Sequence, residues 1–191
     1  MLLEETLKTF FLPEYILKKI EFTEEAPYLI RLKNFLIWGN KRNARQKSES
    51  IFFSLSELLK QKYGEGEWQG NKKGNLNNIL FRLFWESLKN GFEHGNKNDP
   101  EKYVIVVLYL GEKGLTFGFR DEGDFYKNES IKISLESKEA ISSTRTDYRG
   151  GAGTANYRST ADIIYVDTET GTLYLTYLLR RESRTEDWAE N

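Results

Sequence analysis

The sequence contains no cysteine and a single histidine. The absence of cysteine excludes disulfide bonds, thiolate metal sites and cysteine-based catalysis, and it fits a reducing compartment. One histidine, His94, leaves no set of imidazoles for a histidine-ligated metal centre and no separate histidine for a serine-protease triad. Any histidine chemistry in this chain must therefore involve His94.

The sequence also lacks an excess of positive charge and a long apolar run. Its 28 Lys and Arg residues balance 29 Asp and Glu residues, so it has no broad attraction for nucleic acid or anionic membranes. The longest apolar run, Tyr103 to Leu110, is far shorter than the ~20 residues of a membrane-spanning helix. The N-terminal MLLEETLK lacks the basic start of a signal peptide. We therefore expect a cytoplasmic protein that binds neither nucleic acid nor membrane.

What the sequence does contain suits one globular domain. Its length of 191 residues matches one domain of ordinary size, and a hydrophobic content of 39% with 14% aromatic residues supplies a core. We expect a single domain over residues 1–191, with an inserted segment at about 39–74 and a polar tail at about 182–191. The basic cluster KRNARQK within the insertion is interpreted as a solvated loop, with contact to an acidic partner as the alternative.

The N-terminal part predicts a strand followed by a helix. Residues 18–23 (KKIEFT) alternate polar and apolar side chains as a half-buried strand does, and Pro27 opens the run PYLIRLKNFLIW, which is typical of a helix. Within the insertion, IFFSLSELLKQKYG predicts a short amphipathic helix that forms an excursion from the domain.

The second half of the chain predicts antiparallel strands. YVIVVLYL and LTFGFRD are separated by GEKG, and ADIIYVD and TLYLTYLLRR are separated by TETG, so both pairs indicate hairpins. The polar segment 125–154 between them is too long for a turn and is expected to form a lid. We expect an α+β two-layer sandwich, with a mixed, mostly antiparallel sheet and helices on one face.

A long helix, expected from Leu76 to about His94 and ended by the following Gly-Asn pair, carries polar residues near its apolar stripe. At about 100° per residue, Asn90 and His94 fall on the stripe and Glu86 borders it. Burying such groups without partners costs several kcal/mol, so they form an internal hydrogen-bond network or line a ligand cavity. Spacing alone favours the network, and for His94 it favours a role as a helix C-terminal cap.

Four motifs, in order, resemble those of the GHKL ATPase superfamily. The helix end ESLKNGFEHGN resembles its N-box, with the pattern E-x-x-x-N-x-x-x-H. RDEGDFY resembles the first glycine box, DxGxG, and YRGGAGTANYRSTADIIYVD resembles the second. Thr172 within GTLYLTY matches the closing Gly-Thr element. Each motif is common by itself, but the ordered set in its expected context is fairly specific and favours nucleotide binding.

Within the superfamily, the chain is most similar to the compact anti-sigma-factor serine/threonine protein kinases, over about Lys18 to Leu179. These proteins also begin with a strand and a helix like KKIEFT and APYLIRLKNFL, and they lack a histidine-kinase dimerisation hairpin. The resemblance implies the GHKL (Bergerat) ATP-binding fold, with ATP and Mg²⁺ as cofactors. It implies transfer of the ATP γ-phosphate to a protein partner, such as an antagonist of a sigma factor. A homodimer is compatible with the resemblance, although no sequence pattern defines an interface.

The resemblance also implies roles for individual residues. Asp121 would accept a hydrogen bond from the adenine amino group, which favours ATP over GTP. Gly123 would allow the backbone to approach the base, and Thr172 would supply a hydroxyl nearby. Asn90 would ligate Mg²⁺ through its amide oxygen, and Glu86 would act as general base near the γ-phosphate.

The second glycine box supplies the expected phosphate contacts. Gly151 and Gly153 open a helix and would present backbone N–H groups and the helix dipole to the phosphates. Thr154 would cap this helix or contact a phosphate. Three nearby arginines either neutralise phosphate charge or are solvated, and we weigh the two alternatives evenly: Arg145, Arg149 and Arg158.

The first glycine box departs from the family pattern, because Phe125, preceded by Asp124, stands where its second glycine is usual. This departure favours an alternative function, a nucleotide-bound interaction protein with little catalysis. A further alternative is the catalytic domain of a histidine kinase. Its phosphoacceptor histidine would lie on another chain, because His94 already belongs to the nucleotide helix. The simplest alternative is an α+β domain whose polar stripe only closes a hydrogen-bond network. Phe125 and Tyr126 fit the core better than stacking on a base.

Overall fold

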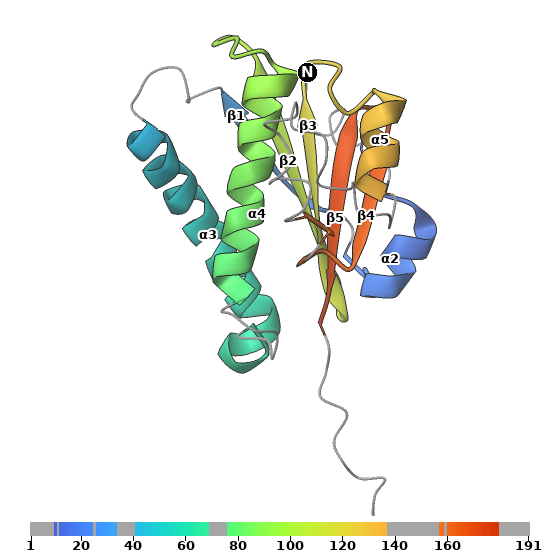
Figure 1. Ribbon diagram of the computed structural model, residues 1–191. Helices are drawn as coiled ribbons and strands as arrows, with labels where there is room; N and C mark the ends of the chain where they lie inside the picture. Colours follow the sequence, from blue (N-terminus) through green and yellow to red (C-terminus); the bar gives the residue numbers. More distant parts are fainter. Residues whose placement is uncertain are drawn as a thin grey trace, which may run out of the picture.

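The computed structural model describes residues 10, 12–24, 26–33, 41–68, 76–136, 157–158 and 160–179. These residues form an α+β structure with a five-stranded antiparallel sheet of order β1-β2-β3-β5-β4 and four α-helices (Figure 1). The strands are β1 (Tyr28–Lys33), β2 (Tyr103–Leu110), β3 (Gly114–Asp121), β4 (Ile163–Asp167) and β5 (Thr172–Leu178). The helices are α2 (Glu14–Ile20), α3 (Lys41–Trp68), α4 (Leu76–Asn90) and α5 (Glu129–Glu136).

Both predicted hairpins are confirmed. β2 and β3 pair antiparallel, as do β4 and β5, and β3 pairs with β5 to join the hairpins. All four strand pairings in the described part of the chain are antiparallel, so the expected mixed sheet is not observed there. The pairing of Arg120 with Thr172 brings the end of β3 beside the start of β5.

The prediction for the N-terminal part was wrong in both elements. Residues 18–20 end helix α2, where Ile16 and Ile20 are buried one turn apart and Glu21 adopts a left-handed conformation that stops the helix. Residues 28–33 form β1, an edge strand paired with β2, in place of the predicted helix. Short apolar runs fit either period, so the pairing with β2 decides the outcome.

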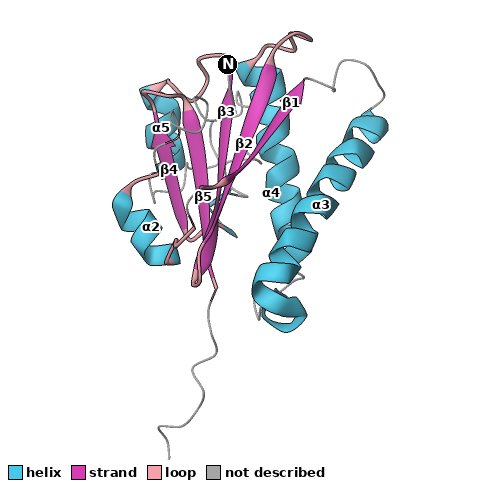
Figure 2. Cartoon of the chain, turned by 180° about the vertical axis from the view of Figure 1, so that it is seen from behind, coloured by secondary structure: helices cyan, strands magenta, loops and turns pink. Residues whose placement is uncertain are grey.

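Helices cover both faces of the sheet, whereas the sequence led us to expect them on one. α3, α4 and α5 contribute to a large core on one face, and α4 lies across the sheet in Figure 1. On the opposite face, Ile16 and Ile20 of α2 pack against Ile105, Val107 and Tyr174. Figure 2 shows the sheet from this side, with α2 beside β4 and β5. Successive side chains along a strand therefore point alternately to the core under α3, α4 and α5 and to the core under α2.

The helix predicted within segment 39–74 is confirmed but starts earlier than expected, so the basic cluster KRNARQK, which we expected in a loop, is helical. The expected excursion from the domain was also wrong, because this helix packs into the main core. α3 runs from Lys41 to Trp68 with a kink at Gly64, which has a φ of 76°. Its buried side chains Phe52, Leu55 and Leu59 belong to the main core, and the Tyr63 hydroxyl donates to the carbonyls of the β2–β3 hairpin. The helix is therefore anchored to the sheet at its C-terminal part.

Among the helices that the structure describes, none combines the length and the apolar character needed to cross a membrane.

Candidate functional site

The helix that carries the polar stripe changes its winding at its C-terminal end. After Asn90, residues Gly91–Gly95 form a π-helical turn, η1, in which the Asn96 N–H donates to the Gly91 carbonyl at 2.7 Å. The wider turn shifts all later side chains relative to a regular wheel. His94, which the wheel placed on the buried face, is therefore exposed, while Phe92 is fully buried. π-turns of this kind often occur at functional sites.

The π-turn brings the end of α4 into close contact with the end of β3. Gly95 lies directly against the Asp121 carboxyl group, because a Cβ at this position would overlap it. Gly123 approaches the Gly95 carbonyl equally closely. Gly91, next to Asn90, faces Val104 and the Asp121 Cβ. Three glycines thus allow Asp121 to sit under the turn, and side chains at these positions would separate the two elements.

The Asp121 carboxyl group is buried and only partly satisfied. Asp121 is 6% exposed, and its Oδ1 accepts a hydrogen bond from the Gly123 N–H at 2.8 Å. Oδ2 is buried and has no hydrogen-bond partner among the described residues. Burial raises the pKa of Asp121 to about 6, although the bond from Gly123 acts in the opposite direction. A buried acceptor without a partner is costly, so this atom suits a ligand or water donor.

Asn90 forms a hydrogen bond with Tyr157, a residue that was not expected from the sequence to belong to the site. Its Nδ2 donates to the Tyr157 hydroxyl at 2.9 Å, and the Ser87 hydroxyl donates to the same oxygen at 3.1 Å. Tyr157 is 1% exposed, so these groups form a small buried network. The contact uses the nitrogen of the Asn90 amide and leaves its Oδ1, the atom that a magnesium ion would require, outside this bond.

Glu86 and Asn90 lie one turn apart on α4, and both are partly buried. Glu86 lies near enough to Tyr157 to contribute to the raised pKa of that tyrosine, after the larger effect of burial. Tyr126 is fully buried, which raises its pKa, and Tyr157 and Asp121 raise it further, Tyr157 also through a side-chain hydrogen bond. The structure therefore gathers Glu86, Asn90 and Asp121 in one region, connected through buried tyrosines.

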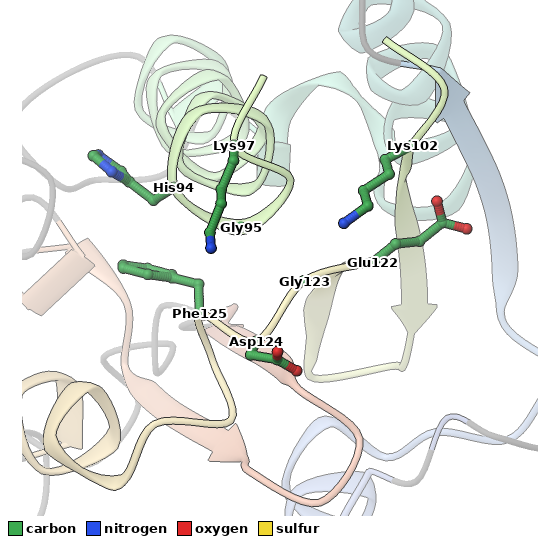
Figure 3. A pocket seen from close by; sticks show the side chains of 8 residues that line it. All are labelled: His94, Gly95, Lys97, Lys102, Glu122, Gly123, Asp124 and Phe125. Carbon is green, nitrogen blue, oxygen red and sulfur yellow. The ribbon is translucent and has the colours of Figure 1, made fainter. Parts of the chain in front are cut away.

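An open pocket of about 290 Å³ lies on the outer side of Gly95 and Gly123. Figure 3 shows the amino groups of Lys97 and Lys102 directed into this space. The residues that line it come from the π-turn, the following loop and the first glycine box: His94, Gly95, Lys97, Lys102, Glu122, Gly123, Asp124 and Phe125. Because Gly95 and Gly123 also cover Asp121, the pocket and the buried carboxyl group share a wall.

In the described structure, the acidic residues of this pocket do not form ion pairs with its two lysines, Lys97 and Lys102. Asp124 pairs with Lys127 at 3.0 Å, and Glu122 accepts from the Tyr103 N–H at 2.9 Å. Neither Lys97 nor Lys102 has an ion-pair partner among the residues that the structure describes. The pocket can therefore accept an anionic group beside the aromatic surface of Phe125.

The described contact of His94 is with Phe125 and not with the helix end. Their rings stack with centroids 5.6 Å apart and an interplanar angle of 25°. Phe125 is also packed against the main core and meets Tyr126 edge-on, with centroids 5.0 Å apart. Both aromatic residues after β3 thus contribute to the core, as expected for aromatic residues that follow a strand. The left-handed residues that follow the π-turn are Lys97 and Asn98, not the predicted Gly95 and Asn96.

Thr172 is not brought together with Asp121. Side chains alternate along β5, and Tyr174 belongs to the cluster on the α2 face, so Thr172 faces that side as well. Its hydroxyl lies 2.9 Å from the Thr170 hydroxyl. Asp121 lies on the α4 face, where it touches Gly95. The sheet therefore separates the two side chains, although their strands are neighbours.

The expected phosphate-binding segment is mostly outside the described residues. Gly151, Gly153 and Thr154 lie there, as do Arg145 and Arg149. Arg158 is described, and its guanidinium donates to the Ser134 carbonyl of α5. Within the described ranges, no group of three or more His, Asp or Glu side chains is placed to hold a metal ion.

The sequence contained a signal for one of the residues that were missed. Ser87 falls about 20° from Leu76 on a regular helical wheel, in the middle of the apolar stripe, so it belongs with the polar residues noted there. Tyr157 and Gly95 gave no comparable signal. Their roles depend on the approach of the segment around residue 157 to α4 and of the π-turn to β3, which a helical wheel does not contain.

No protein-family model and no curated protein sequence matches this chain.

Proposed function

We propose that this protein binds ATP with Mg²⁺ at the junction of α4 and β3 and adopts a GHKL-type ATP-binding fold. The observation that carries the proposal is the buried Asp121 Oδ2, which has no described hydrogen-bond partner. The adenine amino group is a donor of the kind that such an oxygen requires. The ordered motifs support the same assignment, because Asp121 and Gly123 belong to the first glycine box and Asn90 to the N-box.

The arrangement of α4 supports the proposed roles of Asn90 and Glu86. Both side chains are partly buried and lie one turn apart, and Gly91, which follows Asn90, packs against Asp121 at the end of β3. The amide oxygen of Asn90 is a hard ligand of the kind that Mg²⁺ prefers, and the ion would take its remaining ligands from phosphates and water. Lys97 and Lys102 supply positive charge nearby for a polyphosphate. Thr172 has no place in this proposed site, because its side chain lies on the other face.

We further propose that the protein transfers the γ-phosphate to a hydroxyl of a protein partner of the sigma-factor antagonist type. In this step the acceptor oxygen forms a bond to the γ-phosphorus, and the bond from that phosphorus to the bridging oxygen of ADP breaks. Glu86 takes the proton of the hydroxyl, and ADP leaves. The polar environment of Glu86, beside Tyr157 and one turn from Asn90, is consistent with this role.

A second candidate function is a nucleotide-bound interaction protein with little catalysis. The contact from Asn90 to the Tyr157 hydroxyl favours it, because this contact holds the amide within a buried network. The first glycine box favours it too, since Phe125 replaces its second glycine and Asp124 adds another carboxylate near the proposed site. The two candidates share a binding site and differ in turnover.

Calorimetric titration of the full chain with ATP and with GTP, each with and without Mg²⁺, tests the binding proposal. We expect ATP to bind at least about tenfold more tightly than GTP, because the guanine carbonyl would face the Asp121 carboxylate. We also expect Mg²⁺ to strengthen ATP binding. Equal binding of the two nucleotides would contradict the role of Asp121, and no binding of either would remove the proposed function.

Glu86→Ala separates the two candidate functions. If the protein is a kinase, ADP release in the presence of acceptor proteins should fall by at least about a hundredfold in this variant, while ATP affinity stays within about threefold of the original. Glu93→Ala is a matched control, because Glu93 follows on the same helical segment and pairs with Lys89 at the surface. Negligible ADP release by the unmodified chain would favour the interaction protein.

A further inference from the structure

Asn96 carries a fully buried carboxamide at the end of the π-turn. The residue is 0% exposed, and its backbone N–H closes the turn by donating to the Gly91 carbonyl. Its side chain uses both of its polar atoms: Oδ1 accepts from the Glu122 N–H at 2.9 Å, and Nδ2 donates to the Tyr103 carbonyl at 2.9 Å. Because one partner can only donate and the other can only accept, these bonds fix the orientation of the amide.

The two partners of this amide lie at the ends of neighbouring strands. In the register of β2 and β3, Val104 is paired with Asp121. Tyr103 and Glu122 are therefore the next opposite positions at this end of the sheet. The Asn96 amide joins a carbonyl of one to an N–H of the other, as an intervening peptide group would. Asn96 thus attaches the π-turn to both strands at once.

These bonds act on the immediate neighbours of the Asp121 carboxyl group. Gly95, which covers this group, precedes Asn96 in the chain, and Glu122 follows Asp121. The bond from the Glu122 N–H to Asn96 therefore connects the two segments that meet at the buried carboxyl group. An apolar residue at position 96 would leave the N–H and carbonyl groups of this joint without their partners, and the segments would separate to let water reach them.

We infer that Asn96 is a positioning residue of the candidate site, whose carboxamide holds the π-turn against the ends of β2 and β3 and so keeps the Asp121 carboxyl group beneath Gly95. The inference rests on the proposed ATP site, in which Asp121 accepts from the adenine amino group. Asn96 acts through the position of Asp121 and not through contact with a nucleotide. The sequence led us to expect only a helix end at this residue.

The first test is a pH titration of the Asp121 carboxyl group in the ligand-free full chain, followed by carboxyl-carbon NMR in the unmodified protein and in Asn96→Ala. In the unmodified protein, burial raises the pKa of Asp121 to about 6. Opening of the joint hydrates the carboxyl group, so its pKa in Asn96→Ala should fall by about 1 or more toward the ordinary 3.8. Asp124 and Lys127, which also act on this carboxyl group, are the same in both proteins.

Thr116→Val is the matched control for this titration. Thr116 is also 0% exposed and shares a buried hydrogen bond of 2.9 Å with Thr176, but it lies on β3 away from the joint. Its substitution should lower stability and leave the pKa of Asp121 unchanged. If Asn96→Ala does not fold, Asn96→Ser gives the same readout, because a single hydroxyl group is too short to reach both backbone partners.

The second test measures ATP and GTP binding to the same proteins by calorimetry. Asn96→Ala should weaken ATP binding at least about fivefold and should change GTP binding by less than about twofold, because only ATP uses the Asp121 contact. Equal weakening of both nucleotides, or an unchanged pKa of Asp121 in a less stable variant, would mean that Asn96 supports the fold alone and that the inference is wrong. An equal fall of this pKa in Thr116→Val would overturn it as well. If the unmodified chain binds neither nucleotide, the proposed function fails, and the ligand-free titration alone decides whether Asn96 positions Asp121.

Discussion

Asp121 places a carboxyl group where ionisation is unfavourable. Its burial beneath Gly95 raises the pKa to about 6, from 3.8 for an ordinary aspartic acid. The native state therefore retains the proton at pH values where the unfolded chain has lost it. Stability from this group is fully present below about pH 4 and is lost as the pH rises through about 6. A donor bound to Oδ2 would favour the ionised form and offset this loss.

Asp121→Asn should stabilise the ligand-free protein and weaken ATP binding. At pH 7 the free energy of unfolding should rise by about 1–3 kcal/mol, because a buried charge is removed while the oxygen that accepts from Gly123 is kept. ATP affinity should fall at least about tenfold, since the amide nitrogen cannot accept from the adenine amino group. Urea unfolding and calorimetry measure the two effects.

The pH dependence of the same variant provides the control. Between about pH 4 and pH 6, the unmodified protein should lose stability relative to Asp121→Asn as the pH rises, and the difference should level off above that range. A constant difference between the two proteins from pH 4 to pH 7 would show that Asp121 titrates normally. The burial argument for this site would then not hold.

At the scale of elements, the candidate site depends on the joint between α4 and β3. The π-turn Gly91–Gly95 turns small residues toward β3, and Gly123 fits against the carbonyl of Gly95 from the other side. This close approach buries Asp121 and brings Asn90 near it. Glycine is required at Gly95 for space and not for an unusual backbone angle.

Gly95→Ala should therefore damage the site more than an alanine substitution elsewhere in the helices. The added methyl group would overlap the Asp121 carboxyl group, and separation of the elements should cost about 1–3 kcal/mol and at least about tenfold in ATP affinity. Denaturant unfolding and nucleotide titration measure both quantities.

Gly64→Ala is the matched control, because it has a φ of 76° but open space around it. It should cost about 1–3 kcal/mol through backbone strain while leaving ATP affinity unchanged. Equal loss of affinity in the two variants would mean that the joint at Gly95 does not shape the binding site.

The elements that were predictable from sequence are those with a clear hydrophobic pattern or clear turn residues. α4 and both hairpins satisfy local preference and tertiary packing at once, so their patterns are visible in the chain. A strand was predicted where α2 ends, and a helix was predicted where β1 forms. Both apolar runs are short, and the edge pairing with β2 overrides the helical spacing of residues 28–33. The face on which Thr172 lies follows from the register of β5, which no local motif contains.

From spacing alone, the candidate site was predictable only where its residues share one helix, whereas Asp121 and Gly123 were expected from the family resemblance. Glu86 and Asn90 follow from the wheel, but the position of His94 does not, since the π-turn breaks the period just before it. The contacts of Asn90 with Tyr157 and of Asp121 with Gly95 join distant parts of the chain. These contacts decide which polar groups are satisfied, so the unpaired oxygen of Asp121 could be identified only in the folded structure.

At the scale of the whole molecule, helices pack on both faces of the sheet, three on one face and one on the other in the described part of the chain. α3, α4 and α5 bury the larger face, and α2 closes the other near the β2–β3 hairpin, where the Lys113 N–H donates to the Ile20 carbonyl at 2.9 Å. The same hairpin accepts the Tyr63 hydroxyl of α3 through two carbonyls. One hairpin thus contacts helices on both faces of the sheet, which couples α3 to the rest of the described structure.

This coupling predicts that α2 and α3 unfold together with the sheet in a single transition. Leu59→Ala in α3 and Ile20→Ala in α2 remove fully buried side chains from opposite faces, so each should lower the free energy of unfolding by about 2–5 kcal/mol. Phe53→Ala, a side chain of α3 that is 63% exposed, should change it by less than about 1 kcal/mol. Circular dichroism and tryptophan fluorescence, recorded during urea unfolding, should give coincident curves for all three variants. An early, separate loss of helix signal in Leu59→Ala would instead show that α3 folds as an appendage, since its core contacts would then be dispensable for the sheet.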